Sequence, residues 1–294
     1  MEVTPQVSVL LETGCALGEG VVWDHERQAL WFVDIKRRHL WFCDPVAGTH
    51  RNVEAPGQIG WALPAEGGVL LCGLADGLYL FDPATSAFER FADLPLEPAH
   101  NRLNDACVDP AGRVWFGSMD DGESEQTGRF YMFDRGKVFP QGPAGIAITN
   151  GPAVSPEGDR IFFTDTLGKT IMVADLGAHG AGEPRLFADT GALFPEAYPD
   201  GPIVDAEGFL WSGLYSGGGL ARFDRGGKLV DFWAMPTRDI TKMALGGENM
   251  RTAYVTTATK NMSEQDRARW PASGHLLTFE APVAGWVQPL AKLA

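Results

Sequence analysis

The stretch that decides the fold is Val108-Asp109-Pro110-Ala111-Gly112-Arg113-Val114-Trp115-Phe116-Gly117. Its first half, with Asp, Pro and Gly, is typical of a tight turn, and its second half has the β-branched and aromatic residues of a short strand. The same arrangement returns at residues 154–163 and 204–213. A repeated unit of strand, turn and strand predicts an all-β fold built from similar blades.

The apolar strand that follows the turn recurs along the whole chain. Its copies start at Leu30, Val69, Val114, Ile161, Leu210 and Ala253, with spacings of 39, 45, 47, 49 and 43 residues. A unit of this length holds about four short strands, the size of a propeller blade. The chain is therefore predicted to be a six-bladed β-propeller with four-stranded antiparallel blades, because a ring protects the sheet edges that an open array would expose.

The six repeated units also predict how the ring closes and how many domains the chain forms. Gln6–Leu11 precedes the first full unit, so we expect it to pair with strands of the last unit and to close the ring between N- and C-terminal strands. No composition break divides the chain, and residues 1–294 are expected to form a single propeller domain.

Charge and hydropathy narrow the classes of partner. The chain has 24 Lys+Arg against 38 Asp+Glu, a net charge of −14, whereas binding to nucleic acid needs clustered cations. Met1–Pro5 lacks the basic start of a signal peptide, and no apolar run approaches the ~18 residues of a membrane span. We expect a cytoplasmic monomer or weak homo-oligomer that binds neither nucleic acid nor membrane.

The repeats also align the chain with itself. The position four residues before each turn-opening residue carries Glu19, Ile59, Asn104, Asn150, Asp200 and Thr241. Equivalent positions of successive blades surround the central channel, so the carboxylates and carboxamides among them should converge at one mouth. Carboxylates gathered in a partly dry space repel one another unless a positive charge lies among them. Their oxygens and those of the carboxamides suit one divalent cation, which could be Ca²⁺, Mg²⁺, Mn²⁺, Zn²⁺ or Fe²⁺. The alternative is that Asn150 and Asp200 only form Asx turns, helped by the glycines that follow them.

Arg102 adds a cation beside these oxygens. In a strand Arg102 and Asn104 project to the same side, so both could contact one ligand. An arginine fork and a carboxamide are suited to sugar hydroxyls or to a carbonyl oxygen. Alternatively, Arg102 pairs with a structural carboxylate, such as Asp105 or an acid of a neighbouring blade.

With these residues the chain resembles the gluconolactonase/regucalcin-like sugar lactonases, and in motif style the bacterial aldonolactonases. The motifs that carry the resemblance lie in order between about residues 17 and 260. They are Leu17–Trp23 (LGEGVVW), Phe32–Ile35 (FVDI), Arg102–Asp105 (RLND), Ile148–Gly151 (ITNG) and Tyr198–Gly201 (YPDG).

The resemblance implies a six-bladed propeller with one divalent cation in its channel, and it implies roles for particular residues. Glu19, Asn150 and Asp200 would ligate the metal, Asp200 would also be the catalytic acid/base, and Arg102 and Asn104 would bind substrate. The family often has a further acidic substrate contact after the third-blade strand. There this chain has Gly122 at the matching position, so Glu123, or alternatively Asp121, would supply the contact.

Together these features predict a metal-dependent sugar lactonase that hydrolyses a pentono- or hexonolactone to the aldonic acid. Two alternatives stay open. One is an arylesterase or organophosphate hydrolase on the same propeller, with an apolar pocket supplied by Ile59, Trp61 and Phe194. The other is a non-catalytic propeller that binds calcium.

Overall fold

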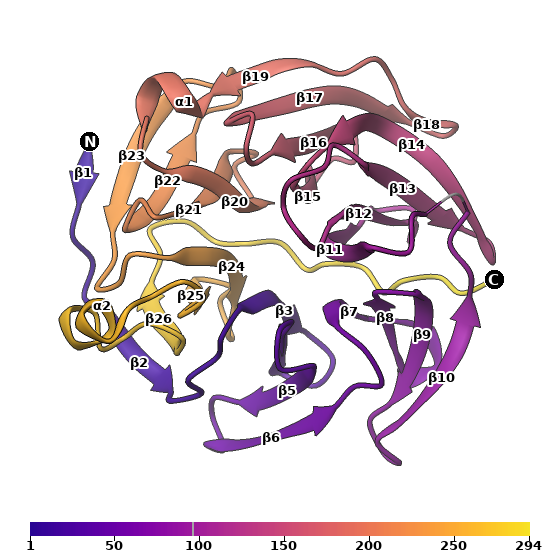
Figure 1. The fold of residues 1–294 in the computed structure, drawn as a ribbon, viewed down its shortest axis with the longest axis horizontal. Helices are drawn as coiled ribbons and strands as arrows, with labels where there is room; N and C mark the ends of the chain where they lie inside the picture. The colour runs from indigo at the N-terminus through magenta and orange to yellow at the C-terminus, as the bar shows by residue number, and fades with distance from the viewer. Residues whose placement is uncertain (96) are drawn as a thin grey trace.

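Six small antiparallel sheets stand around a central channel in the computed structural model, which describes residues 1–95 and 97–294 (Figure 1). Each sheet is a blade with four main strands, and two of the sheets carry one additional short strand, so the predicted all-β six-bladed propeller is confirmed. The innermost strands, from blade 1 to blade 6, are β3 (Gly18–Asp24), β7 (Ile59–Pro64), β11 (Asn101–Val108), β15 (Thr149–Val154), β20 (Tyr198–Val204) and β24 (Ile240–Gly246).

The remaining strands continue each blade outward. They are β4 (Ala29–Asp34), β5 (His39–Asp44) and β6 (Thr49–Glu54) in blade 1; β8 (Leu70–Leu74), β9 (Gly77–Asp82) and β10 (Ala87–Ala92) in blade 2; β12 (Val114–Asp120), β13 (Gly128–Asp134) and β14 (Lys137–Ile146) in blade 3; β16 (Arg160–Asp165), β17 (Thr170–Gly177), β18 (Gly180–Ala181) and β19 (Arg185–Asp189) in blade 4; β21 (Leu210–Tyr215), β22 (Gly219–Phe223) and β23 (Leu229–Ala234) in blade 5; and β25 (Thr252–Thr257) and β26 (Leu276–Glu280) in blade 6.

The N-terminal segment closes the ring as predicted. β2 (Ser8–Leu11) pairs antiparallel with β26 and becomes the outer strand of blade 6. The sequence did not predict the pairing before it, in which β1 (Glu2–Val3) adds to the outer edge of blade 5, parallel to β23. The first eleven residues therefore tie two blades together.

The turn motif that revealed the repeat is held by a buried hydrogen bond to tryptophan. Asp109 Oδ2 accepts from Trp115 Nε1 at 2.8 Å, and Asp205 Oδ2 accepts from Trp211 Nε1 at 2.9 Å. The Asp109 Oδ1 atom also accepts from two backbone amides of its own turn. The turn aspartates thus fasten the inner hairpins and are not free for chemistry.

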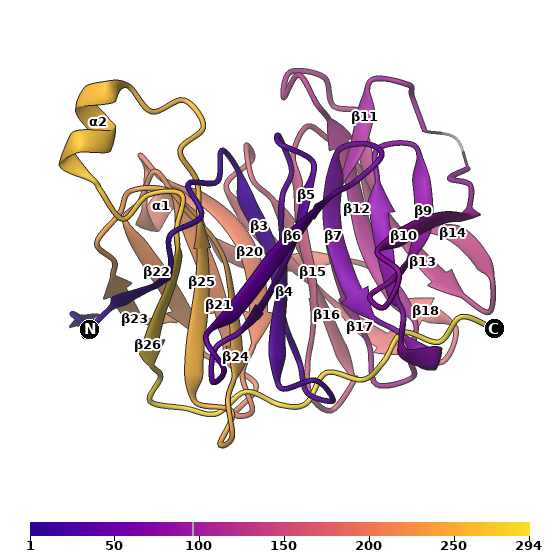
Figure 2. The same cartoon turned by 90° about the horizontal axis from the view of Figure 1, so that it is seen from below.

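The two faces of the ring differ. On one face the helix α2 (Glu264–Arg269) projects at the outer rim of the ring, and the C-terminal segment runs along the opposite face (Figure 2). That segment is bound to blades far apart in sequence, through Gly285 N to Met250 O, Ala291 N to Pro64 O and Lys292 N to Gly112 O. The remaining helices are α1 (Thr190–Leu193) and a 3-10 turn at Glu66–Gly68. No helix within residues 1–95 and 97–294 has the length and apolar character that a membrane crossing requires.

Candidate active site

A polar cavity of about 340 Å³ opens at the channel mouth, and its lining includes Lys260 and Asn261 from the loop that leads to α2. All the residues that the sequence singled out for binding or catalysis line it. They are Glu19, Arg102, Asn104, Glu123, Asn150 and Asp200. They come from blades 1, 3, 4 and 5, so the ring brings together side chains that lie up to 181 positions apart in the sequence.

A local irregularity of the inner strands aims these side chains. In every blade the register of the inner strand with its neighbour shifts at the candidate position, as between Glu19 and Val22, Asn150 and Ala153, and Asp200 and Ile203. Such bulges re-aim a side chain and end regular pairing. Gly201, directly after Asp200, has a φ of 36°, a conformation that side chains disfavour. Gly201 therefore adopts the backbone conformation that the bulge requires. The polar side chains at the bulges line the cavity, so they do more than form turns.

Two carboxylates in this cavity are almost fully buried. Glu19 is 4% exposed and Asp200 5% exposed. Burial, with the nearby charge of Asp105, raises the pKa of Glu19 to about 8. Burial, with the charge of Glu19 next, raises the pKa of Asp200 well above its ordinary value. The charge of Glu19 thus hinders the ionisation of Asp200, as expected for acids that share a poorly solvated space.

Hydrogen bonds fix the amides between these acids. Asn104 Nδ2 donates to Asn150 Oδ1 at 3.1 Å and to the Thr149 carbonyl at 2.7 Å. Asn150 Nδ2 donates to Thr166 Oγ1 at 2.9 Å, and Thr166 donates to the Pro199 carbonyl. Because the Asn150 amino group donates to Thr166, a ligand would be bound by the Asn150 carbonyl oxygen, which has a second lone pair besides the one that accepts from Asn104.

Arg102 is anchored differently from the pairing considered from the sequence. Its Nη1 donates to Asn104 Oδ1 at 2.6 Å, and its Nε donates to Asp121 Oδ1 at 2.8 Å. Asp105, the partner suggested by proximity in the sequence, is bound elsewhere. Burial opposes the ionisation of Asp121, but hydrogen bonds from Lys36 and Gln58 and the charge of Arg102 lower its pKa to about 2. Asp121 therefore acts as a fixed anion behind the arginine.

Glu123 lies in the cavity and is paired across the mouth with Lys260, whose ammonium donates to Glu123 Oε1. Glu123 has a φ of 59°, unusual for a residue with a side chain. Its carboxylate thus extends from blade 3 toward the loop of blade 6. Of the two acids considered for this position, Glu123 lines the cavity and Asp121 supports Arg102.

The donors present fit a hard divalent cation. Glu19 Oε2 is buried and has no hydrogen-bond partner among the described residues, and it shares the cavity with Asp200 and the carbonyl oxygen of Asn150. A cation there would relieve both the unpaired oxygen and the repulsion between the acids. Across the described ranges, no three His, Cys, Asp or Glu side chains group as a metal site. The candidate set is therefore two carboxylates and one carboxamide.

Several cavity residues carried no recognisable signal in the sequence. These are Thr166, Tyr215, Ser216, Arg238, Lys260 and Asn261. Tyr198, which also lines the cavity, is part of the Tyr198–Gly201 motif, but the sequence assigned it no role. Arg238 and Lys260 lie on loops that only the closed ring brings to the mouth. The other two register positions serve packing, since Ile59 is in the hydrophobic core and Thr241 Oγ1 donates to the Gly18 carbonyl at 2.6 Å.

The apolar pocket expected for an arylesterase does not form from the residues suggested for it. Ile59 and Trp61 are buried in the core between blades, and Phe194 packs against the core cluster of blades 4 and 5. None of these three residues lines the polar cavity. Trp61 lines an apolar cavity elsewhere in the channel, and Phe194 caps α1 outside the inner strands.

A six-bladed propeller with an acid-and-amide cluster at one channel mouth defines the class to which this chain belongs. The chain is a member of the SMP-30/gluconolactonase/LRE-like family, whose model matches residues 17–259. The resemblance found in the sequence motifs is thereby confirmed.

Its relatives include curated lactonases. The chain is 31% identical over 274 residues to a 6-deoxy-6-sulfogluconolactonase of Pseudomonas putida, with 93% of this chain and 94% of the relative covered. It is 33% identical over 287 residues to an L-arabinolactonase of Azospirillum brasilense, covering 95% and 93%. The solved structure of a calcium-binding protein, regucalcin, from Agrobacterium tumefaciens matches with a TM-score of 0.94 and 27% identity over 99% of each chain.

Proposed function

We propose that this protein hydrolyses a sugar lactone to the aldonic acid with the help of one divalent cation. The observation that carries the proposal is the convergence of Glu19, Asn150 and Asp200 in one cavity, with a buried carboxylate oxygen of Glu19 lacking a partner among the described residues. The named activities of the relatives support lactone hydrolysis as the reaction class.

Glu19, Asn150 and Asp200 would hold the cation. When bound, it would polarise the lactone carbonyl and lower the pKa of the attacking water. Asp200 would accept a proton from that water and return it to the ring oxygen as the ester bond breaks. Its burial favours such an exchange, since a desolvated carboxylate holds its proton more tightly than one in water.

Arg102 and Asn104 would orient the sugar. Because Asp121 and Asn104 hold the guanidinium on two sides, the arginine is fixed before substrate arrives, which lowers the entropy cost of binding. Glu123 and Lys260 would contact hydroxyls at the outer end of the lactone. The cavity size and these polar groups favour five- and six-carbon aldonolactones.

A lactone panel tests the reaction and its cation. Hydrolysis of arabinono-, xylono-, glucono- and 6-deoxy-6-sulfogluconolactone and of an aryl acetate is measured above the spontaneous rate. The chelated protein is then supplied with Ca²⁺, Mg²⁺, Mn²⁺, Zn²⁺ or Fe²⁺. We expect lactone hydrolysis that is lost on chelation and restored by a cation. Cation binding with no hydrolysis of any ester would favour the calcium-binding alternative, and a preference for the aryl ester would favour the arylesterase.

Asp200→Asn tests the proposed acid/base and ligand. This nearly isosteric change should lower the lactonase rate at least about a hundredfold and weaken cation binding, because it removes a charge and a proton acceptor together. The matched control is Asp175→Asn at an exposed site on β17, which should leave both unchanged. Near-normal turnover by the metal-free Asp200→Asn protein would refute the mechanism.

A further inference from the structure

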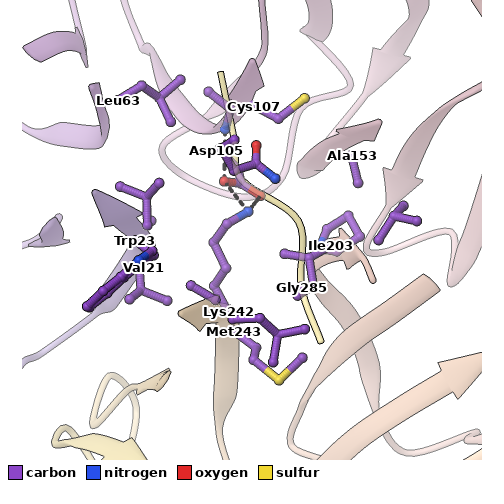
Figure 3. Close-up of a pocket in the computed structure, with 18 of the residues that line it drawn as sticks. Val21, Trp23, Leu63, Asp105, Cys107, Ala153, Ile203, Lys242, Met243 and Gly285 are labelled. Carbon is purple, nitrogen blue, oxygen red and sulfur yellow. Dashed lines mark hydrogen bonds and ion pairs between the residues drawn. The ribbon is translucent and has the colours of Figure 1, made fainter. Parts of the chain in front are cut away.

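A buried ion pair lies directly beneath the candidate cation site. Lys242, on β24 of blade 6, extends across the channel to Asp105, on β11 of blade 3 (Figure 3). Its Nζ lies 2.8 Å from Asp105 Oδ1 and 2.7 Å from Oδ2. Lys242 is 6% exposed and Asp105 1% exposed, so water screens this pair little.

Backbone amides complete the bonding of the Asp105 carboxylate. Its Oδ2 also accepts from Gly151 N at 3.0 Å, and its Oδ1 accepts from Ala106 N at 2.8 Å. Gly151 directly follows the candidate ligand Asn150. Asp105 therefore links the strands of blades 3 and 4 at the level of the cluster, and Lys242 holds it there from the opposite side of the ring.

Asp105 is close enough to act on the cluster electrostatically. After burial, its charge is among the causes that raise the pKa of Glu19 and of Asp200, and the charge of Lys242 acts in the opposite direction on both. A third carboxylate thus stands beside the two candidate ligands, with both of its oxygens turned to the lysine.

The pair also divides the channel into two compartments. Above it lies the polar cavity with Glu19 and Asp200. Below it lies an apolar cavity lined by Trp23, Leu63 and Met243 and closed by the C-terminal segment at Gly285 (Figure 3). Lys242 is itself among the residues that line the apolar cavity, and its ammonium is held at the Asp105 carboxylate.

We propose that Lys242 is a positioning residue that holds Asp105 out of the oxygen cluster, so that the candidate site presents two carboxylates and prefers divalent over trivalent cations. Without the ammonium, Asp105 would add a third negative charge to the site and favour ions of higher charge. This inference rests on the cation site of the proposed function but not on lactone hydrolysis.

The test compares binding of Ca²⁺ with binding of Tb³⁺, an ion of similar ligand preference and higher charge. Calorimetry gives both affinities, and terbium emission sensitised by the cavity residues Tyr198 and Tyr215 reports where Tb³⁺ binds. Lys242→Met removes the ammonium but retains an unbranched side chain. In this variant the ratio of Tb³⁺ to Ca²⁺ affinity should rise at least about tenfold. An unchanged ratio in this variant would overturn the proposal.

Two further variants separate charge from packing. Lys242→Met combined with Asp105→Asn removes both charges, and its ratio should return to within about threefold of the wild-type value. Asp105→Asn alone leaves the lysine unpaired and should shift the ratio at least about tenfold toward Ca²⁺. This variant keeps the proposal falsifiable if Lys242→Met does not fold, since an unchanged ratio here also overturns it.

The matched control is Lys228→Met, at an exposed turn of blade 5, which should not alter the ratio. If the wild-type protein binds neither ion, the cation site of the proposed function fails and this inference fails with it. If the wild type binds both and the variants leave the ratio unchanged, only the inference fails.

Discussion

At the scale of single residues, the chemistry of the candidate site depends on burial as much as on residue type. Glu19 and Asp200 are ordinary acids in the sequence, and an internal alignment of the repeats was enough to pair them. Their raised pKa values arise mainly from desolvation, with the charge of Asp105 next for Glu19 and the charge of Glu19 next for Asp200. The sequence therefore predicted which groups meet but not their protonation.

The pKa of Glu19 predicts that cation binding releases protons. A carboxyl with a pKa raised to about 8 is mostly protonated at pH 7 in the metal-free protein, and it must ionise to bind a cation. We expect at least about one proton released per ion at pH 7, with affinity rising as the pH approaches 8. Calorimetry in two buffers of different ionisation enthalpy measures the number.

The control for proton release is Glu19→Gln, which should release fewer protons. At pH 9 Glu19 should contribute almost no proton to the release in the wild type, because its carboxyl is then ionised before the ion arrives. Tight binding at pH 7 without proton release would contradict the prediction.

At the scale of elements, the bulges decide where the polar side chains point. The turn and strand pattern predicted the inner strands. It did not predict the bulges, because side chains of a regular strand alternate strictly between its two faces and the pattern does not mark where a bulge interrupts this alternation. The slip after Asp200 brings Gly201 against blade 6, where an added Cβ would lie 2.3 Å from the Thr241 carbonyl oxygen. The glycine is thus required by both conformation and space.

Gly201→Ala should lower the free energy of unfolding by more than about 2 kcal/mol. A left-handed conformation costs a residue with a Cβ about 1–2 kcal/mol, and the contact with Thr241 adds to it. Gly48→Ala is the control, because Gly48 has a φ of 67° and open space around it. Urea unfolding of both variants gives the comparison, and equal losses would show that the close contact has no effect.

At the scale of the whole molecule, ring closure joins the two ends of the repeat. Gln6–Leu11 precedes the first full unit of the repeat, and on that ground it was predicted to pair with strands of the last unit. The structure confirms this with β2 on β26 and adds the parallel contact of β1 with β23. Removing the closing strand would leave β26 as an open edge.

Deleting residues 1–11 should therefore lower the Tm by about 10 °C and promote self-association, since blade 6 loses its outer strand. Deleting only residues 1–4 removes β1 but spares β2, and should cost no more than a few degrees. Calorimetry and light scattering compare the two proteins. Equal losses would mean that β1 rather than β2 closes the ring.

The sequence by itself determined the propeller, the closing strand and the set of acids and amides that meet at the channel mouth. It could do so because turn residues and strand periodicity are local and repeat along the chain. Only the tertiary structure decided the partners of those residues. Lys242 and Asp105 pair across 137 positions, Lys260 bridges to Glu123, and Arg102 turns to Asp121 instead of Asp105. Such contacts depend on the width of the closed channel and on which side chains are desolvated within it, and no local pattern records either quantity.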